Sequence, residues 1–222
     1  MKKLLLITSL LLLSLSVIAA IDISKLHTII KEKHTNQFEY KVSKRHVFNV
    51  DSLKGVVCSA YTPLECKSHN KEKGFNLNIE HTWPQSKGSK YFPAQGDMHH
   101  LYVTSKESNS MRANHPFSIV YQSEWSKQGS LFGLDDRMRD SFEPVDGHKG
   151  NVARAMFYFS IRYKKSISKS QETLFRSWNK LDPVDEFELL RNNRINSLQG
   201  NRNPFIDDEL LVNQILEFKF FN

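Results

Sequence analysis

The sequence predicts an α+β fold that is mostly helical, with a short strand–loop–strand–helix segment near its centre. Apolar residues recur at helical spacing in several segments, whereas the alternation typical of a strand is confined to the centre. The hydrophobic fraction of 39% and the aromatic fraction of 11% are those of an ordinary globular protein. No repeat, low-complexity tract or Gly/Ser linker interrupts the chain, which argues against a string of modules.

The first twenty residues have the layout of a signal peptide. Lys2 and Lys3 precede an apolar run over residues 4–18, and the small residues Ala19 and Ala20 follow it. The run is shorter than the about 20 apolar residues that a transmembrane helix needs. We therefore expect export with cleavage near Ala20, a single domain over residues 21–222, and no membrane segment after cleavage. A retained N-terminal anchor is the alternative.

The chain is basic. Its formal net charge is +7, and removal of Lys2 and Lys3 with the signal leaves 7 − 2 = +5. Such a surface attracts polyanions, although charge bears on association rather than on fold.

The two cysteines, Cys58 and Cys66, both lie in the part of the chain that would be exported. In an oxidising compartment we expect them to pair as a disulfide. The closed loop is short, so the bond would add about 2–3 kcal/mol to stability. The alternative, two ligands of a zinc site, fits poorly because zinc cysteines usually stand closer together.

Helices are predicted near both ends of the chain. Leu26, Ile29 and Ile30 recur at helical spacing, and a longer helix is expected over residues 150–164. Its inward-facing positions would be Ala153, Met156, Phe157 and Ile161.

Two further helices are predicted from their terminal residues. Ser168 with Gln171 forms a capping-box signature for a helix carrying Leu174, Trp178 and Leu181. Asp182 and Pro183 would open the next helix, and Gly200 would close it.

The central segment alternates like a half-buried strand: Phe75, Leu77 and Ile79 are apolar, whereas Asn76, Asn78 and Glu80 are polar. Pro84 would stop this strand. A polar loop follows, and the apolar residues 101–103 are the candidate second strand.

A short helix is expected directly after the second strand. Thr104 with Glu107 suggests a capping box at its start, and Asn109 and Arg112 would share one face at i, i+3.

These central residues offer the groups that phosphodiester hydrolysis needs. His81 is the candidate general base, because imidazole titrates near neutrality. Glu80 and the amide oxygen of Asn109 would hold a divalent cation, Mg²⁺ or another such as Mn²⁺ or Ca²⁺. Neighbouring side chains of a regular strand point to opposite faces, so a bend is expected between Glu80 and His81.

Other residues leave alternatives open. Arg112 would contact a phosphate as a planar donor, or form a salt bridge with a nearby carboxylate. Glu107 could reach the cation, but the capping role is favoured. His99 and His100 open the second strand, where only one of them would face a cleft, and either would serve to fix a loop.

Taken together, these segments resemble the endonuclease I family of periplasmic and secreted nucleases, and most of the chain after about residue 50 shares the likeness. The ordered set of motifs carries the resemblance: IEHTWPQS at 79–86, GDMHHLY at 96–102, NSMRANHPF at 109–117, FYF at 157–159, LFRSWNK at 174–180, RNNR at 191–194 and LQGNRNPF at 198–205.

The resemblance implies a ββα-metal (His-Me finger) motif within a largely helical fold, and cleavage of DNA and often RNA with little sequence preference. It implies His81 as the base, Glu80 and Asn109 as metal ligands, and products with 5′-phosphates. The protein would be a periplasmic or secreted monomer.

Two departures from the family pattern concern the loop. Gln95 stands where some members have a carboxylate, and the loop that carries an arginine in some members is shorter here. Lys87 or Lys90 is therefore expected to contact the phosphate backbone.

Two other functions compete with this hypothesis. An exported nucleic-acid-binding protein that kept the fold without catalysis is one. A zinc metallohydrolase using His81, His99 and His100 is the other, and it would hold stoichiometric zinc tightly.

Overall fold

Helices form most of the frame in the computed structural model, which describes residues 21–68 and 76–221. The predicted signal peptide and Phe75, the expected start of the central strand, lie outside these residues. The helices are α1 (Ile23–Lys33), α2 (Tyr40–Val50), α3 (Lys106–Arg112), α4 (Lys149–Tyr163), α5 (Lys169–Leu181), α6 (Glu186–Gln199) and α7 (Pro204–Asp207).

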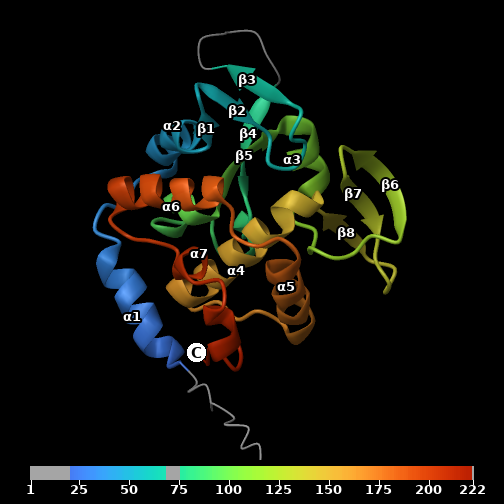
Figure 1. Cartoon of the computed structure of the whole chain (residues 1–222). Coiled ribbons are helices and arrows are strands. Elements are labelled where there is room, and N and C mark those ends of the chain that lie inside the picture. The colour runs from blue at the N-terminus through green and yellow to red at the C-terminus, as the bar shows by residue number, and fades with distance from the viewer. Residues whose placement is uncertain (1–20, 69–75, 222) are drawn as a thin grey trace, which may run out of the picture.

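The strands form three small antiparallel sheets (Figure 1). The α+β prediction is therefore confirmed. One sheet holds β1 (Ser52–Leu53), β2 (Val56–Cys58) and β3 (Cys66–Ser68); the second holds β4 (Leu77–His81) and β5 (Leu101–Ser105); the third holds β6 (Gln122–Lys127), β7 (Ser130–Leu134) and β8 (Asp140–Glu143).

The centre of the chain has the predicted order of strand, loop, strand and helix. Strand β4 pairs with β5, and three short 3-10 turns, η1 (Gln85–Lys87), η2 (Ala94–Gly96) and η3 (Met98–His100), occupy the loop between them. Helix α3 follows β5 directly. This order brings one end of β4 against α3.

The expected capping box at the start of α3 is wrong. The N-cap is Ser105, whose hydroxyl accepts from the backbone N–H of Ser108. Thr104 is still part of β5 and lies opposite Asn78, so it is held by the sheet instead of capping the helix. Glu107 pairs with Lys127 on β6 at 2.6 Å and accepts from the indole of Trp125. Glu107 is therefore structural, as predicted, but with other partners.

The caps of the C-terminal helices agree in part with the prediction. The Ser168 hydroxyl caps α5 by accepting from the N–H of Gln171, and Gly200 ends α6 in a left-handed conformation, as expected. The predicted start of α6 at Asp182 is wrong, because Asp185 is the N-cap. Asp182 instead ends α5, and its carboxylate accepts from the N–H of Gly150 on α4.

Helix α4 lies at the centre of the larger core. The predicted inward-facing positions are confirmed, since they are at most 8% exposed, and α1, α5 and α7 contact this helix. On α1, Ile30 is buried as expected, whereas Ile29 is 41% exposed. A second, smaller core lies between β4–β5 and α2 and includes Ile79, Leu101 and Val103. Helix α1 and the sheet β6–β8 lie on opposite sides of the molecule in Figure 1.

The sequence analysis missed the sheet β6–β8. Its first two strands turn through Gln128 and Gly129, which both have positive φ. Two such residues form the tight turn whose twist suits a β-hairpin. β6 and β8 hold one apolar residue each, Trp125 and Phe142, and in β7 the apolar residues Leu131 and Phe132 are adjacent. None of these strands therefore shows the apolar alternation used to predict the central strand.

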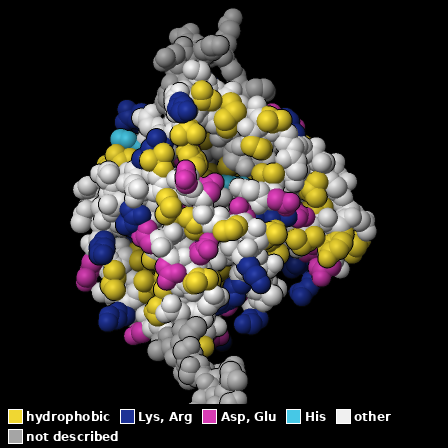
Figure 2. All heavy atoms as spheres, viewed as in Figure 1, with side chains coloured by type: hydrophobic (Ala, Val, Ile, Leu, Met, Phe, Trp, Pro, Cys, Tyr) yellow, Lys and Arg dark blue, Asp and Glu magenta, His cyan; other side chains and the backbone are white. Residues whose placement is uncertain are grey.

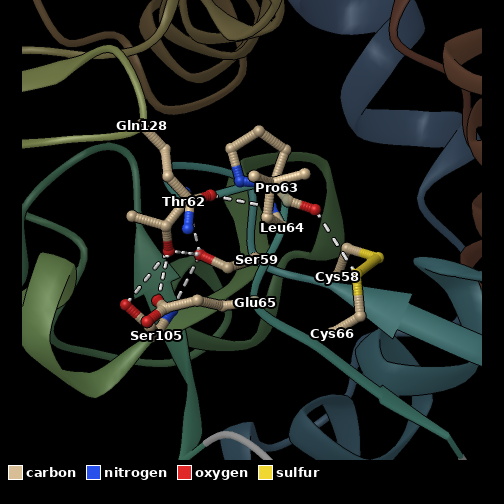
Figure 3. Close-up of a disulfide and its surroundings, with 9 residues drawn as sticks. All are labelled: Cys58, Ser59, Thr62, Pro63, Leu64, Glu65, Cys66, Ser105 and Gln128. Carbon is tan, nitrogen blue, oxygen red and sulfur yellow. Dashed lines mark hydrogen bonds between the residues drawn. A yellow bond between two sulfur atoms is a disulfide. The ribbon is translucent and has the colours of Figure 1, made fainter.

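The predicted pairing of Cys58 with Cys66 is confirmed, and Figure 3 shows the disulfide beside the turn that it closes. The two cysteines face each other across β2 and β3. Charged side chains are scattered over the face seen in Figure 2, and Lys and Arg do not gather there into one continuous patch. Within residues 21–68 and 76–221 no helix has the length and apolarity that a membrane span requires.

Candidate active site

A cavity of about 490 Å³ opens where β4 ends against α3. Glu80 and His81 from β4 and Asn109 from α3 all line it, together with Tyr40 from α2 and Gln85 from η1. The predicted base and the two predicted metal ligands therefore share one cavity, whereas Arg112, the other residue predicted to take part in catalysis, does not line it.

The expected bend between Glu80 and His81 is wrong. Glu80 pairs with Tyr102 and His81 with Leu101 in an unbroken antiparallel ladder, so the strand is regular up to its last residue. The two side chains leave opposite faces of the strand. Both reach the cavity because it lies across the end of β4, and no distortion of the backbone is needed.

His81 is 7% exposed and held from three sides. Its Nε2 lies 3.1 Å from the carbonyl oxygen of Gln95, so this nitrogen carries the proton and donates. Nδ1 then keeps its lone pair, and the side-chain amide of Gln85 lies 3.4 Å from it. The rings of Tyr40 and His100 pack against the imidazole at 4.9 and 5.5 Å.

Burial, with a smaller contribution from nearby His100, lowers the pKa of His81 to about 3. The ring is therefore neutral at pH 7 and able to accept a proton. A phosphate anion entering the cavity would raise this pKa by charge attraction.

Glu80 is a buried carboxylate, 4% exposed. Its Oε1 accepts from the hydroxyl of Tyr61 at 3.0 Å and lies 3.3 Å from Nε of Arg112. Burial raises the pKa of Glu80, while Arg112 and the Tyr61 hydroxyl oppose that rise. Both contacts fall on Oε1, and Oε2 makes neither of them.

Asn109 is oriented by the same strand. Its amide nitrogen donates to the carbonyl oxygen of Ile79 at 3.1 Å, so its amide oxygen is left to act as an acceptor. One carboxylate oxygen and one amide oxygen are the hard ligands that Mg²⁺ takes from a protein, since water and substrate phosphate complete its shell. Glu80 and Asn109 thus fit a divalent cation of this kind.

Arg112 lies one turn beyond Asn109 and is 1% exposed. Its guanidinium donates to the carbonyl oxygens of Thr82 and His115 at 3.1 and 2.7 Å and stacks on the ring of Phe117 at 4.1 Å. Of the two roles the sequence left open, this geometry supports the ion pair, here with Glu80. A direct phosphate contact by Arg112 stays a prediction.

The two lysines of the loop lie differently. Lys87 is exposed, and burial of its stem together with nearby Arg112 lowers its pKa. It lines a smaller second cavity beside the first. Lys90 is exposed and lies over the ring of Tyr91 at 5.9 Å, outside both cavity walls. Contact of Lys87 or Lys90 with phosphate stays a prediction.

His99 and His100 fix loops. Nε2 of His99 lies 3.1 Å from the carbonyl oxygen of Asn201, and Nε2 of His100 lies 2.7 Å from that of Ala94. In the described part of the chain, no group of three or more His, Cys, Asp or Glu side chains is placed to hold a metal ion. The three-histidine zinc site therefore finds no support.

Comparison with known proteins identifies the family of this chain. The family model for endonuclease I matches residues 19–209. This chain belongs to the endonuclease I family.

Named relatives fall in the same group. The chain is 34% identical over 128 residues to a periplasmic deoxyribonuclease of Aeromonas hydrophila, covering 55% of this chain and 52% of that protein. It is 33% identical over 166 residues to an extracellular ribonuclease of Bacillus subtilis (strain 168), which covers 64% of this chain and 56% of that protein. Against endonuclease-1 of Buchnera aphidicola subsp. Baizongia pistaciae (strain Bp) the identity is 32% over 136 residues, covering 61% and 53%. The chain thus spans about half the length of the relatives it matches.

Four residues of this endonuclease I chain contact the candidate site without having been predicted, and one of them, Tyr40 from α2, packs against the ring of His81. Tyr61 comes from the disulfide-closed turn, Gln85 from the start of the loop, and Gln95 contributes a backbone carbonyl from η2. Gln85 stands beside Pro84 in the motif quoted above, so its position was a usable signal. Tyr61 lies in no motif, and a backbone carbonyl carries no residue signal.

Proposed function

We propose that this chain is an exported, metal-dependent endonuclease that hydrolyses phosphodiester bonds of DNA, with RNA as a second candidate substrate and little sequence preference. The observation that carries the proposal is the convergence of His81, Glu80 and Asn109 on one cavity. Membership of the endonuclease I family supports the same reaction.

His81 is the general base in this proposal. Its Nε2–H is committed to the carbonyl of Gln95, so Nδ1 carries the lone pair, and the attacking water would replace the Gln85 amide that lies 3.4 Å from Nδ1. The neutral imidazole takes a proton from that water as it attacks phosphorus. Tyr40 and His100 keep the ring from turning away, since they pack against it from two sides.

Glu80 and Asn109 would hold one divalent cation, Mg²⁺ or a substitute such as Mn²⁺ or Ca²⁺. When bound, the cation stabilises charge on the phosphate and on the departing 3′ oxygen. Cleavage of the bond between phosphorus and the 3′ oxygen leaves products with 5′-phosphates. Arg112 and Tyr61 hold Glu80 in place, and Lys87 or Lys90 would hold the backbone of the substrate.

The same proposal includes the compartment and the oligomeric state in which the protein acts. Relatives are named periplasmic or extracellular nucleases, which supports export into the periplasm or the medium, and the disulfide fits such a compartment. The chain would act as a monomeric single domain over residues 21–222.

The test is cleavage of supercoiled plasmid by the purified chain, with EDTA and after Mg²⁺ is restored. Cleavage should stop in EDTA and return with the metal. His81→Ala should reduce turnover by about 100-fold or more, as expected for loss of a general base, while DNA binding is retained. Glu80→Ala should lose both metal binding and activity.

His46→Ala serves as the control, because this α2 histidine lies outside the cavity. If the chain binds plasmid but does not cut it with Mg²⁺, Mn²⁺ or Ca²⁺, a nucleic-acid-binding protein without catalysis is favoured. Equal cleavage by His81→Ala and the unmodified chain would remove His81 from the base role.

A further inference from the structure

A second cavity, of about 170 Å³, adjoins the catalytic one, and Pro84 lines both. The floor of this second cavity is apolar and aromatic, and each of its residues is at most 8% exposed: Trp83, Phe117, Met156, Ile167 and Phe175. Neither the base nor the cation site uses this space. Its position next to the candidate cleavage site makes it available to the substrate strand.

The size of the cavity limits what enters it. An apolar cavity of about 150 Å³ in another protein accepts benzene, so a volume of about 170 Å³ suits one six-membered aromatic ring. A fused two-ring system fills more of this volume, so a single ring is the better fit. Aromatic side chains in the floor favour a flat π-system, because nucleobases stack on such rings whatever their sequence.

The mouth of the cavity is polar and cationic. Lys87 lines it and is exposed, and it takes part in no salt bridge among the described residues, whereas Arg112 is buried at 1% exposure and paired with Glu80. The first turn of α5 contributes Ser168 and Gln171. An anion at this mouth is favoured by Lys87 and by the N-terminal end of the helix.

Gln171 adds a specific acceptor. Its amide nitrogen donates to the carbonyl oxygen of Phe117 at 2.6 Å, which fixes the side chain and leaves the amide oxygen for a ligand. Every pyrimidine of nucleic acids carries an N–H donor at its edge. The cavity therefore combines an apolar, aromatic-lined interior, one acceptor and a cationic rim.

We propose that this cavity is a base pocket, which receives a pyrimidine of the substrate strand next to the scissile phosphate. The inference rests on the proposed nuclease function and adds a preference to it. The phosphate on the deoxyribose of that nucleotide stays at the rim near Lys87, and a purine, with its second fused ring, fits the cavity less well. A base must leave its stack to enter, so single strands and frayed duplexes are cut faster than intact duplex.

The test uses the full chain in EDTA, so that binding is measured without cleavage. Thymidine 3′,5′-bisphosphate, deoxyadenosine 3′,5′-bisphosphate and deoxyribose 3,5-bisphosphate are titrated by calorimetry. The thymidine compound should bind about tenfold more tightly than the other two, as expected when one base–aromatic stack is gained. Equal affinity for all three would overturn the base pocket.

Two variants of Ile167 probe the cavity itself. Ile167→Ala enlarges it and should bring the deoxyadenosine compound to within about threefold of thymidine, because stacking tolerates any base that fits. Ile167→Phe fills it and should abolish the preference for thymidine. Val120→Ala is the matched control, since Val120 is equally buried at 8% exposure and lies outside the cavity. Circular dichroism and thermal unfolding establish that each variant is folded.

Plasmid cleavage with Mg²⁺ separates this inference from the function on which it rests. If the chain cuts plasmid but does not bind the thymidine compound more tightly, the base pocket is refuted and the nuclease function is retained. Thymidine-selective binding that Ile167→Phe removes, in a chain that never cuts plasmid, would keep the pocket and refute the nuclease. Cut sites mapped on a mixed single-stranded oligonucleotide should lie beside pyrimidines, and cuts spread evenly over purines and pyrimidines would contradict the pocket.

Discussion

Glu80 is a buried carboxylate whose orientation depends on two neighbours. The Tyr61 hydroxyl at 3.0 Å and the Arg112 guanidinium at 3.3 Å both hold Oε1. Outer partners of this kind orient a ligand, and their loss commonly weakens metal binding about 10- to 100-fold. Tyr61 is therefore a positioning residue in the proposed site, acting through Glu80 without touching the substrate.

Tyr61→Phe should weaken Mg²⁺ or Mn²⁺ binding by about tenfold, measured by calorimetry, because only the hydroxyl that restrains Glu80 is removed. The matched control is Tyr102→Phe. Tyr102 is also buried, at 4% exposure, and lies opposite Glu80 in the sheet, but Tyr61 is the tyrosine that donates to this carboxylate. Equal losses in the two variants would assign the effect to packing instead of to the hydrogen bond.

The disulfide loop between β2 and β3 is the element that delivers Tyr61. Within this turn the hydroxyls of Ser59 and Thr62 bond each other at 2.7 Å, and Thr62 donates to the carboxylate of Glu65 (Figure 3). The Ser59 hydroxyl also accepts from the backbone N–H of Ser105, the N-cap of α3. The turn is thus tied to the helix that carries Asn109.

A Cys58→Ser/Cys66→Ser double variant should lose about 2–3 kcal/mol of unfolding free energy, because the unfolded chain regains the entropy of the short loop. Urea unfolding measures this loss. The double variant should also bind Mg²⁺ more weakly, since the turn that presents Tyr61 is loosened. Unchanged stability in the variant, matched by unchanged stability of the unmodified chain in reducing agent, would contradict the argument.

Helices α4 and α5 approach closely at Gly150. A Cβ there would stand 1.9 Å from the carbonyl oxygen of Asp182. Gly150→Ala should therefore destabilise the fold by about 1–3 kcal/mol, as overpacking does, although alanine is the better helix former.

Thermal and urea unfolding of Gly150→Ala measure this cost. Gly147→Ala is the control, because a Cβ at Gly147 meets nothing within 4 Å, and the change should stay within about 0.5 kcal/mol. A Gly150→Ala variant as stable as the control would show that the two helices can move apart at no cost.

Buried neutral histidines distinguish the molecule as a whole. Burial lowers the pKa of His99 and His100 to about 4 each, and that of His148 to about 3. In the unfolded chain these rings bind protons near pH 6.5. Below that pH the unfolded state binds more protons than the folded state, so stability is complete above pH 6.5 and is lost as the pH falls toward 4.

The unfolding free energy should fall between pH 6.5 and pH 4.5 by about 1.4 kcal/mol per pH unit for each such histidine, and change little between pH 7 and 8. Urea titrations across this range measure it. His148→Gln should reduce the slope of unfolding free energy against pH by about 1.4 kcal/mol per pH unit, the contribution of one proton. A slope that is unchanged in His148→Gln would show that His148 is protonated in the folded state.

Several features of this protein are present in local sequence. The helix over residues 149–163, the cap at Ser168, the left-handed stop at Gly200 and the disulfide partners all follow from spacing or from residue type. Such features depend on neighbours within a few positions, so one sequence suffices to predict them. The identities of His81, Glu80 and Asn109 as candidates came from residue chemistry and from the family motifs in the same way.

Other features depend on contacts between distant segments. Asp182 accepts from Gly150 on another helix, so its role as a helix end was invisible in local pattern. The shared cavity arises because β4 ends against α3, not from a bend between Glu80 and His81. Tyr61 reaches Glu80 across 19 positions of sequence, and the carbonyl of Gln95 that orients His81 has no side-chain signature. Spacing describes neighbours along the chain, whereas burial and hydrogen bonding across the fold determine which groups meet.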